Sequence, residues 1–160
     1  MDTWRAFAKF CEALPWGGPI RDSLWGYPFI QLVHFTGLSV WLGTNVMVDL
    51  RLLGIGKEKE TAAELNDSLF MWNWIGFAIV VTGGFLLFSP IAGTYIINPA
   101  FQVKLAMLVP TALIWHIMVQ QKTRSWGRSP ETPGIAKLAG LLEILLWFSA
   151  VIAAVNIPNF

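Results

Sequence analysis

The sequence has little charge and a single cysteine. Only 13% of its 160 residues are Asp, Glu, Lys or Arg, about half the share found in ordinary soluble domains. The net charge of +1 provides no attraction for polyanions and argues against a nucleic-acid-binding protein. Because Cys11 is the only cysteine, the chain has no disulfide framework and no cysteine-ligated iron–sulfur cluster.

Apolar and aromatic residues take the place of the missing charges. Hydrophobic residues make up 55% of the chain, and aromatic residues 14%, among them nine Trp and eleven Phe. The mean hydropathy is +0.56, which excludes a disordered chain. So few charged residues cannot cover the surface of a soluble protein of this length. We therefore expect an integral membrane protein.

Four apolar segments are long enough to cross a bilayer, which takes about 20 mostly apolar residues. They span about residues 28–50, 70–89, 100–119 and 135–155. The connections between them hold most of the charges and turn-forming residues. The sequence therefore predicts an all-α fold, in which residues 25–160 form a transmembrane four-helix bundle.

Residues 1–24 form a separate segment, which lacks the continuous apolar stretch of a signal peptide. Its apolar residues recur at helical spacing at Trp4, Phe7, Ala8, Cys11 and Leu14. This pattern predicts an amphipathic helix that begins at Asp2 or Thr3 and ends at Pro15. Two positions remain open for it: the plane of the membrane interface, or the surface of a partner subunit.

Lys and Arg are concentrated in two of the connections. The first and third connections, with the residues beside them, hold Arg51, Lys57, Lys59, Lys122, Arg124, Arg128 and Lys137. The other side has Arg5, Lys9, Arg21 and Lys104. Positive residues favour the cytoplasmic side, so we expect a multi-pass protein of the bacterial inner membrane with both termini in the periplasm.

The only two histidines both lie within predicted membrane segments, where an ionisable side chain is costly and points to a function. His34 is about two turns from the outer end of its segment, and His116 about one turn from the inner end of its own. Their depths therefore differ by roughly 10–15 Å, given the rise of a helix. A single haem or metal ion cannot easily take both as ligands within one chain.

Depth along the helices sorts the polar residues into two clusters. The outer cluster contains Gln31, His34, Gln102, Lys104 and Asn156. The inner cluster contains Asn45, Asp49, Asn73, His116 and Glu143. Glu143 has two possible partners: it could accept a hydrogen bond from the His116 ring, or extend to the interface and pair with Lys137. We slightly favour Lys137.

Haem ligation is one chemistry that suits the two histidines, because imidazole is a common axial ligand of haem iron. His34 and His116 are therefore candidate haem or metal ligands. Met107, near His34 in depth, or a histidine of a second copy could supply another axial ligand, and Lys104 could pair with a haem propionate. The alternatives are hydrogen bonding of each histidine to a neighbouring helix, a proton relay, or metal transport.

Three further residues are candidates for a cofactor pocket. Trp41 and Asn45 share a helix face with His34, from which they are separated by near-integral numbers of turns. Trp41 could line a ring-binding pocket, but we favour core packing for it. Glu143 could belong to a proton or quinone site.

Several stretches resemble a family of uncharacterised small bacterial four-span membrane proteins. These are HFTGLSVWLG at His34–Gly43, DLRLLG at Asp49–Gly54, TGGFLLF at Thr82–Phe88, and NPAFQVKL at Asn98–Leu105 with His116 beyond it. More distantly, the spacing His-xx-Gly-Leu-xx-Trp-x-Gly resembles the copper-resistance D membrane proteins and the cytochrome b561-like bundles. The b561-like resemblance implies paired histidines that hold one haem near each membrane face. This chain has one histidine near each face instead of two.

We therefore expect a haem b electron-transfer subunit of a bacterial inner-membrane redox complex, not a self-contained enzyme. Its partners would be the lipid bilayer, other membrane subunits or a second copy, and a quinone or a periplasmic redox protein. The alternatives are a cofactor-free structural or assembly subunit, and a small transporter of copper or another cation.

Overall fold

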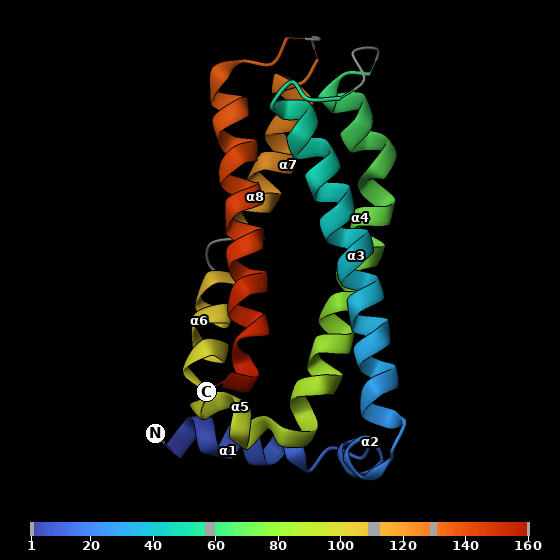
Figure 1. Cartoon of the computed structure of the whole chain (residues 1–160), viewed down its shortest axis with the longest axis vertical. Helices are drawn as coiled ribbons and strands as arrows, with labels where there is room; N and C mark the ends of the chain where they lie inside the picture. The colour runs from blue at the N-terminus through green and yellow to red at the C-terminus, as the bar shows by residue number, and fades with distance from the viewer. Residues whose placement is uncertain (1, 57–59, 109–112, 129–130, 160) are drawn as a thin grey trace.

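The computed structural model describes residues 2–56, 60–108, 113–128 and 131–159, and within these ranges every element is a helix (Figure 1). The long helices are α3 (Gly26–Leu52), α4 (Ala62–Phe88) and α8 (Gly134–Val155). Each coincides with one predicted membrane segment and is longer than predicted, although α4 ends one residue before the predicted end at residue 89. The third predicted segment falls on α6 (Pro99–Met107) and α7 (Ile114–Trp126).

Some sequence predictions fall outside the described residues. Residues 109–112, in the middle of the third predicted segment, belong to this group. So do Lys57 and Lys59, which entered the count of positive charges.

The long helices run lengthwise and leave two distinct ends (Figure 1). We call the end with the α3–α4 and α7–α8 connections the inner end. The opposite end, where both chain termini lie, is the outer end.

Helices α3 and α4 pack closely because glycines stand where they cross. A Cβ atom at Gly76 of α4 would lie 2.7 Å from the backbone nitrogen of Trp41 on α3. A Cβ atom at Gly37 of α3 would lie 2.9 Å from the backbone nitrogen of Val80 on α4. Small residues of this kind allow two helix backbones to approach each other.

The inner half of the molecule has an apolar core to which all the long helices contribute. Its buried residues are Leu52, Ala62, Val119, Ala136 and Ala139, with Trp115 and Trp126 packed against them. Toward the outer end the helices separate into two pairs, α3 with α4 and α6 with α8 (Figure 1). Among the described residues, α6 packs mainly on α8 and on the short helix α5 (Ala92–Ile97).

The N-terminal segment forms α1 (Asp2–Glu12) and α2 (Gly17–Asp22), which lie across the outer end (Figure 1). The predicted amphipathic helix is therefore present, although it ends at Glu12 and not at Pro15. Ala8 and Cys11 are buried against Ala92, and Glu12 Oε1 accepts a hydrogen bond from the Gly93 backbone N–H at 2.7 Å. One side of α1 thus docks on α5 of the same chain, a contact that the sequence did not predict.

Two stretches, Ala62–Ile97 and Gly134–Val155, are long and apolar enough to cross a membrane. Large apolar side chains on the outside of α8, such as Leu138, Phe148 and Ile152, are more than half exposed. Extended exposed apolar surface is rare on soluble monomers. These features point to association with a bilayer.

Candidate functional site

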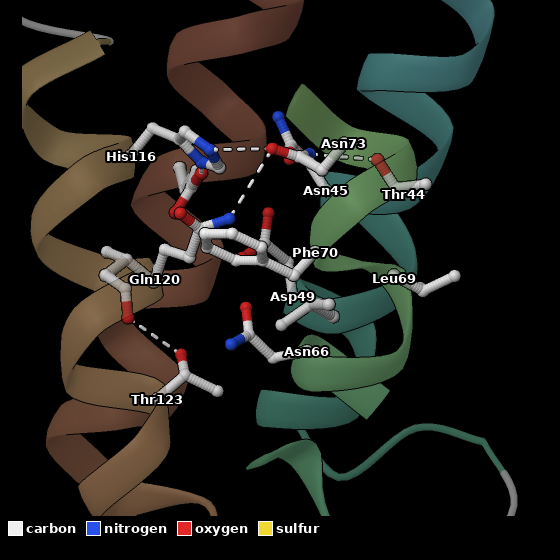
Figure 2. Close-up of a pocket in the computed structure, with 13 residues that line it drawn as sticks. Thr44, Asn45, Asp49, Asn66, Leu69, Phe70, Asn73, His116, Gln120 and Thr123 are labelled. Atoms are coloured by element: carbon white, nitrogen blue, oxygen red, sulfur yellow. Dashed lines mark hydrogen bonds and ion pairs between the residues drawn. The ribbon is translucent and has the colours of Figure 1, made fainter. Parts of the chain in front are cut away.

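Polar side chains from α3, α4, α7 and α8 surround a cavity of about 20 Å³ in the inner half (Figure 2). The polar lining residues are Thr44, Asn45 and Asp49 on α3, Asn66 and Asn73 on α4, His116, Gln120 and Thr123 on α7, and Glu143 on α8. All five residues of the predicted inner cluster are among them. The sequence prediction that these residues lie together is therefore confirmed.

The three ionisable residues of this cavity are almost fully buried. Asp49 and Glu143 are each 2% exposed and His116 is 4% exposed. Buried charges are costly unless hydrogen bonds and opposite charges compensate them. The hydrogen bonds of the site therefore decide which protonation states it can adopt.

The orientation of Asn73 follows from a chain of hydrogen bonds that starts at the backbone of α3. Thr44 Oγ1 donates its only proton to the Trp41 carbonyl at 2.8 Å. Thr44 Oγ1 must then accept from its other neighbour, Asn73 Nδ2, at 2.9 Å. Asn73 Nδ2 also donates to Asn45 Oδ1. With its amide nitrogen placed here, Asn73 turns its oxygen toward α7 (Figure 2).

His116 is held by hydrogen bonds at both ring nitrogens. Its Nε2 lies 3.2 Å from Asn73 Oδ1, and because an amide oxygen only accepts, Nε2 carries a proton. Its Nδ1 lies 2.5 Å from Glu143 Oε1. A neutral imidazole with its proton on Nε2 has a lone pair on Nδ1, which cannot bond to a carboxylate. A second proton therefore lies between His116 and Glu143.

This pair has two forms that satisfy the geometry. It is either an imidazolium beside a carboxylate, or a neutral imidazole that accepts from a carboxylic acid. The expected alternative, a pair between Glu143 and Lys137, is wrong: Glu143 points inward and is bonded to His116. Trp147 Nε1 also donates to Glu143 Oε1, at 3.4 Å.

An apolar layer borders the site on the side of the outer end. Trp41 and Trp147 stand one turn outward from Asn45 and Glu143, and their ring centroids are 4.3 Å apart. Val80 completes the buried part of the layer, against which Leu38, Leu42, Phe77, Leu108 and Leu146 pack. Trp41 is therefore a packing residue of this layer, and Asn45 belongs to the inner polar site.

His34 lies on α3, eleven residues outward from Asn45, or about 16 Å along the helix. Its Nδ1 lies 2.8 Å from the Val80 carbonyl oxygen, so Nδ1 carries the proton and Nε2 has a lone pair. Gly84 faces the ring, since a Cβ atom there would lie 3.2 Å from Cε1. Lys104 is close enough for its charge to act on His34.

The two histidines differ in how well they fit a haem. His34 can offer Nε2 to iron, and the carbonyl bond at Nδ1 would orient the ring, as is usual for a histidine ligand. His116 has both nitrogens bonded within the protein, beside a cavity far too small for a porphyrin. Met107 ends α6, which in the described part of the chain packs mainly on α8 and α5. Within that part of the chain, no three His, Cys, Asp or Glu side chains come together as a metal site.

The predicted outer cluster is only partly assembled. The charge of Lys104 reaches His34, but Gln102 turns back to the Ile96 carbonyl at 2.8 Å. Asn156 bonds to the Ile152 carbonyl of its own helix, and Gln31 is exposed.

Several polar residues of the inner cavity were not predicted from the sequence. Gln120 and Thr123 follow His116 by four and seven residues, which places them on the same face of α7. Asn66 precedes Asn73 by seven residues and shares its face of α4. Helical spacing from the two residues already identified would have been enough to find all three.

A family of unknown function, DUF6644, has a family model that matches residues 20–158, and the chain belongs to this family. No curated protein and no solved structure matches the chain. The expected membership of an uncharacterised family is confirmed, while the likeness to copper-resistance D and b561-like proteins stays a prediction.

Proposed function

We propose that this member of DUF6644 is an integral membrane protein and that its buried His116–Glu143 pair takes up and releases protons. The proposal rests on one observation. The hydrogen bonds of Asn73 place a proton on His116 Nε2, so the 2.5 Å contact between Nδ1 and Glu143 Oε1 requires a second proton. Within membrane bundles, ionisable residues of this kind mark proton relays.

The membrane topology is part of the proposal. The two apolar stretches Ala62–Ile97 and Gly134–Val155 would be two of four spans. The others would be α3, whose 27 residues reach about 40 Å, and the α6–α7 segment. Lys and Arg residues near the inner end favour a cytoplasmic position for that end. Both termini would then lie in the periplasm.

The position of the site favours proton exchange with one side of the membrane. Thr123 is three residues from the end of α7, and Asp49 is three residues from the end of α3. The layer around Trp41 and Trp147 separates the site from the outer half. Protons would therefore enter from the cytoplasmic end, and passage further outward would require this layer to move.

Glu143→Gln tests the proposal with little change in shape. The purified protein in lipid nanodiscs is expected to take up protons after a pH jump, measured with a pH-sensitive dye. The variant should take up fewer, because its amide cannot hold the shared proton. Asp67→Asn is the matched control and should behave like the wild type, because Asp67 is exposed and pairs with Arg124 away from the cavity. Equal uptake by the wild type and Glu143→Gln would contradict the proposal.

Nuclear magnetic resonance of ¹⁵N-labelled histidine gives the same test a structural readout. With only two histidines, His34→Gln leaves a single labelled ring. The Nδ1 signal of His116 should show a strongly shared proton. In Glu143→Gln the Nδ1 signal of His116 should change to the signal of a neutral ring that carries its proton on Nε2.

A second candidate function is electron transfer through a b-type haem in the outer half, and one observation favours it. The bond of His34 Nδ1 to the Val80 carbonyl leaves Nε2 available as an iron ligand. Lys104 would pair with a propionate. When bound, the haem would supply one-electron chemistry. A quinone or a periplasmic redox protein would be the natural partner.

An absorption spectrum tests the haem directly. The reduced-minus-oxidised spectrum of the purified protein is expected to show b-type bands. These bands should be lost in His34→Ala. They should be kept in His116→Gln, because both ring nitrogens of His116 are already hydrogen-bonded within the protein. A colourless, folded protein would contradict the haem proposal, but it would not contradict the proposed proton uptake by His116 and Glu143.

A further inference from the structure

Three buried polar atoms at the inner cavity have no hydrogen-bond partner within the described parts of the chain. They are Asp49 Oδ2, Asn45 Nδ2 and Asn66 Nδ2. All three residues line the cavity (Figure 2), and each is at most 4% exposed. Buried polar groups nearly always have a partner. These atoms therefore point to an occupant of the cavity.

The orientation of the Asn45 side-chain amide is fixed by its hydrogen bond to Asn73. Its Oδ1 accepts from Asn73 Nδ2, and Asn73 is itself fixed by Thr44. Asn45 must therefore present its NH2 group, and not its oxygen, to the cavity. The cavity thus offers an amide donor beside a carboxylate acceptor.

Water is the occupant that fits this set of atoms. One water molecule accepts from amide N–H groups and donates to a carboxylate oxygen, and it needs about 10–15 Å³ of a cavity of this kind. The cavity of about 20 Å³ meets that need. A metal cation prefers oxygen ligands, which the NH2 group of Asn45 does not supply. An anion would be repelled by Asp49 and Glu143.

We propose that an ordered water in this cavity links Asp49 to the His116–Glu143 pair, and that Asp49 passes protons from the inner end to the pair. This inference rests on the proposed function. The Asp49 carboxylic acid gives its proton to the water, and the water gives one of its own to the Glu143 carboxylate. Nothing is oxidised or reduced, and Asp49 recovers a proton from the inner side.

Asp49 is placed for this step by its depth and its neighbours. It stands one turn inward from Asn45 on α3, between the pair and the inner end. The only other titratable residues that line the cavity, in the described chain, are His116 on α7 and Glu143 on α8, because α4 contributes amides. Nearby Arg51 is directed elsewhere, with its Nε donating to the Glu60 carbonyl at 2.6 Å.

The test is the rate at which the proton shared by His116 and Glu143 exchanges with solvent, followed by the labelled-histidine signal. Asp49→Asn keeps the shape of the side chain but cannot relay a proton. We expect exchange at least tenfold slower, with the His116 signal itself unchanged. Asp67→Asn is the matched control, since Asp67 is exposed and pairs with Arg124 at 3.0 Å, away from the cavity.

A second variant keeps the test valid if Asp49→Asn does not fold. Asn66→Leu fills the cavity with apolar atoms and should exclude the water, which also slows exchange at least tenfold. Unchanged exchange in a folded Asp49→Asn or Asn66→Leu protein would overturn the relay. Failure of the proposed function would look different: the His116 signal would then not respond to Glu143→Gln at all.

Discussion

Glu143→Ala is expected to lower the free energy of unfolding by about 3–5 kcal/mol, because removing one member of a buried pair leaves the other without compensation. Two buried nitrogen atoms are hydrogen-bonded to Glu143 Oε1: His116 Nδ1 at 2.5 Å and Trp147 Nε1 at 3.4 Å. Both lose this partner in the variant, and a void is left beside them. Unfolding in mixed micelles measures the loss.

Replacing both partners separates stability from function. Buried ion pairs exchanged for apolar residues of similar volume are often neutral or more stable. His116→Leu combined with Glu143→Leu should therefore recover most of the stability lost in Glu143→Ala, since Asn73 Oδ1 keeps Gln120 Nε2 as a neighbour at 3.5 Å. The double variant should still take up fewer protons than the wild type. If it is as unstable as Glu143→Ala, the pair is required for folding, which would explain its presence without a role in proton uptake.

Gly76→Ala is expected to lower the free energy of unfolding by about 1–3 kcal/mol through overpacking. The added Cβ atom would lie 2.7 Å from the backbone nitrogen and 3.0 Å from the Cα atom of Trp41. A backbone cannot turn aside as a side chain can, so α3 and α4 must separate. Asn73 is one turn away on α4, and its bonds to Thr44 and Asn45 should lengthen. Proton uptake should therefore fall together with stability.

Gly43→Ala is the matched control for this change. Gly43 also lies within α3, but a Cβ atom there has nothing within 4 Å. The variant should gain about 0.5–1 kcal/mol, because alanine is favoured over glycine inside a helix. Similar effects of the two substitutions would show that contact between α3 and α4 does not decide the outcome at Gly76.

The depth of residues along their helices could be predicted from the sequence. A fixed rise per residue places Asn45, Asp49, Asn73, His116 and Glu143 at similar levels, whatever the rotation of each helix. Burial then requires polar groups at one level to meet one another. For this reason the sequence predicts the inner cluster correctly without knowledge of how the helices pack.

Partners that depend on helix rotation or on the backbone could not be predicted. Glu143 was expected to pair with Lys137, because a sequence does not show toward which neighbour a long side chain turns. The bond between His34 and the Val80 carbonyl has no sequence signal, since every residue has a carbonyl. Helix α5 was missed because its segment lies between Pro90 and Pro99, which resemble the borders of a turn.

The docking of α1 on α5 has a consequence for the biogenesis of the protein. Glu12 and Gly93 are 81 residues apart in the chain, so α1 is synthesised long before its binding place exists. In the membrane topology proposed above, α1 can dock only after α3 and α4 have inserted and brought α5 to the same side of the bilayer. A chain inserted with the opposite topology at α4 would leave Ala8 and Cys11 exposed. Helix α1 is thus made before α5 but reaches its place only after α5 does, and in this topology its docking reports that the insertion of α4 was correct.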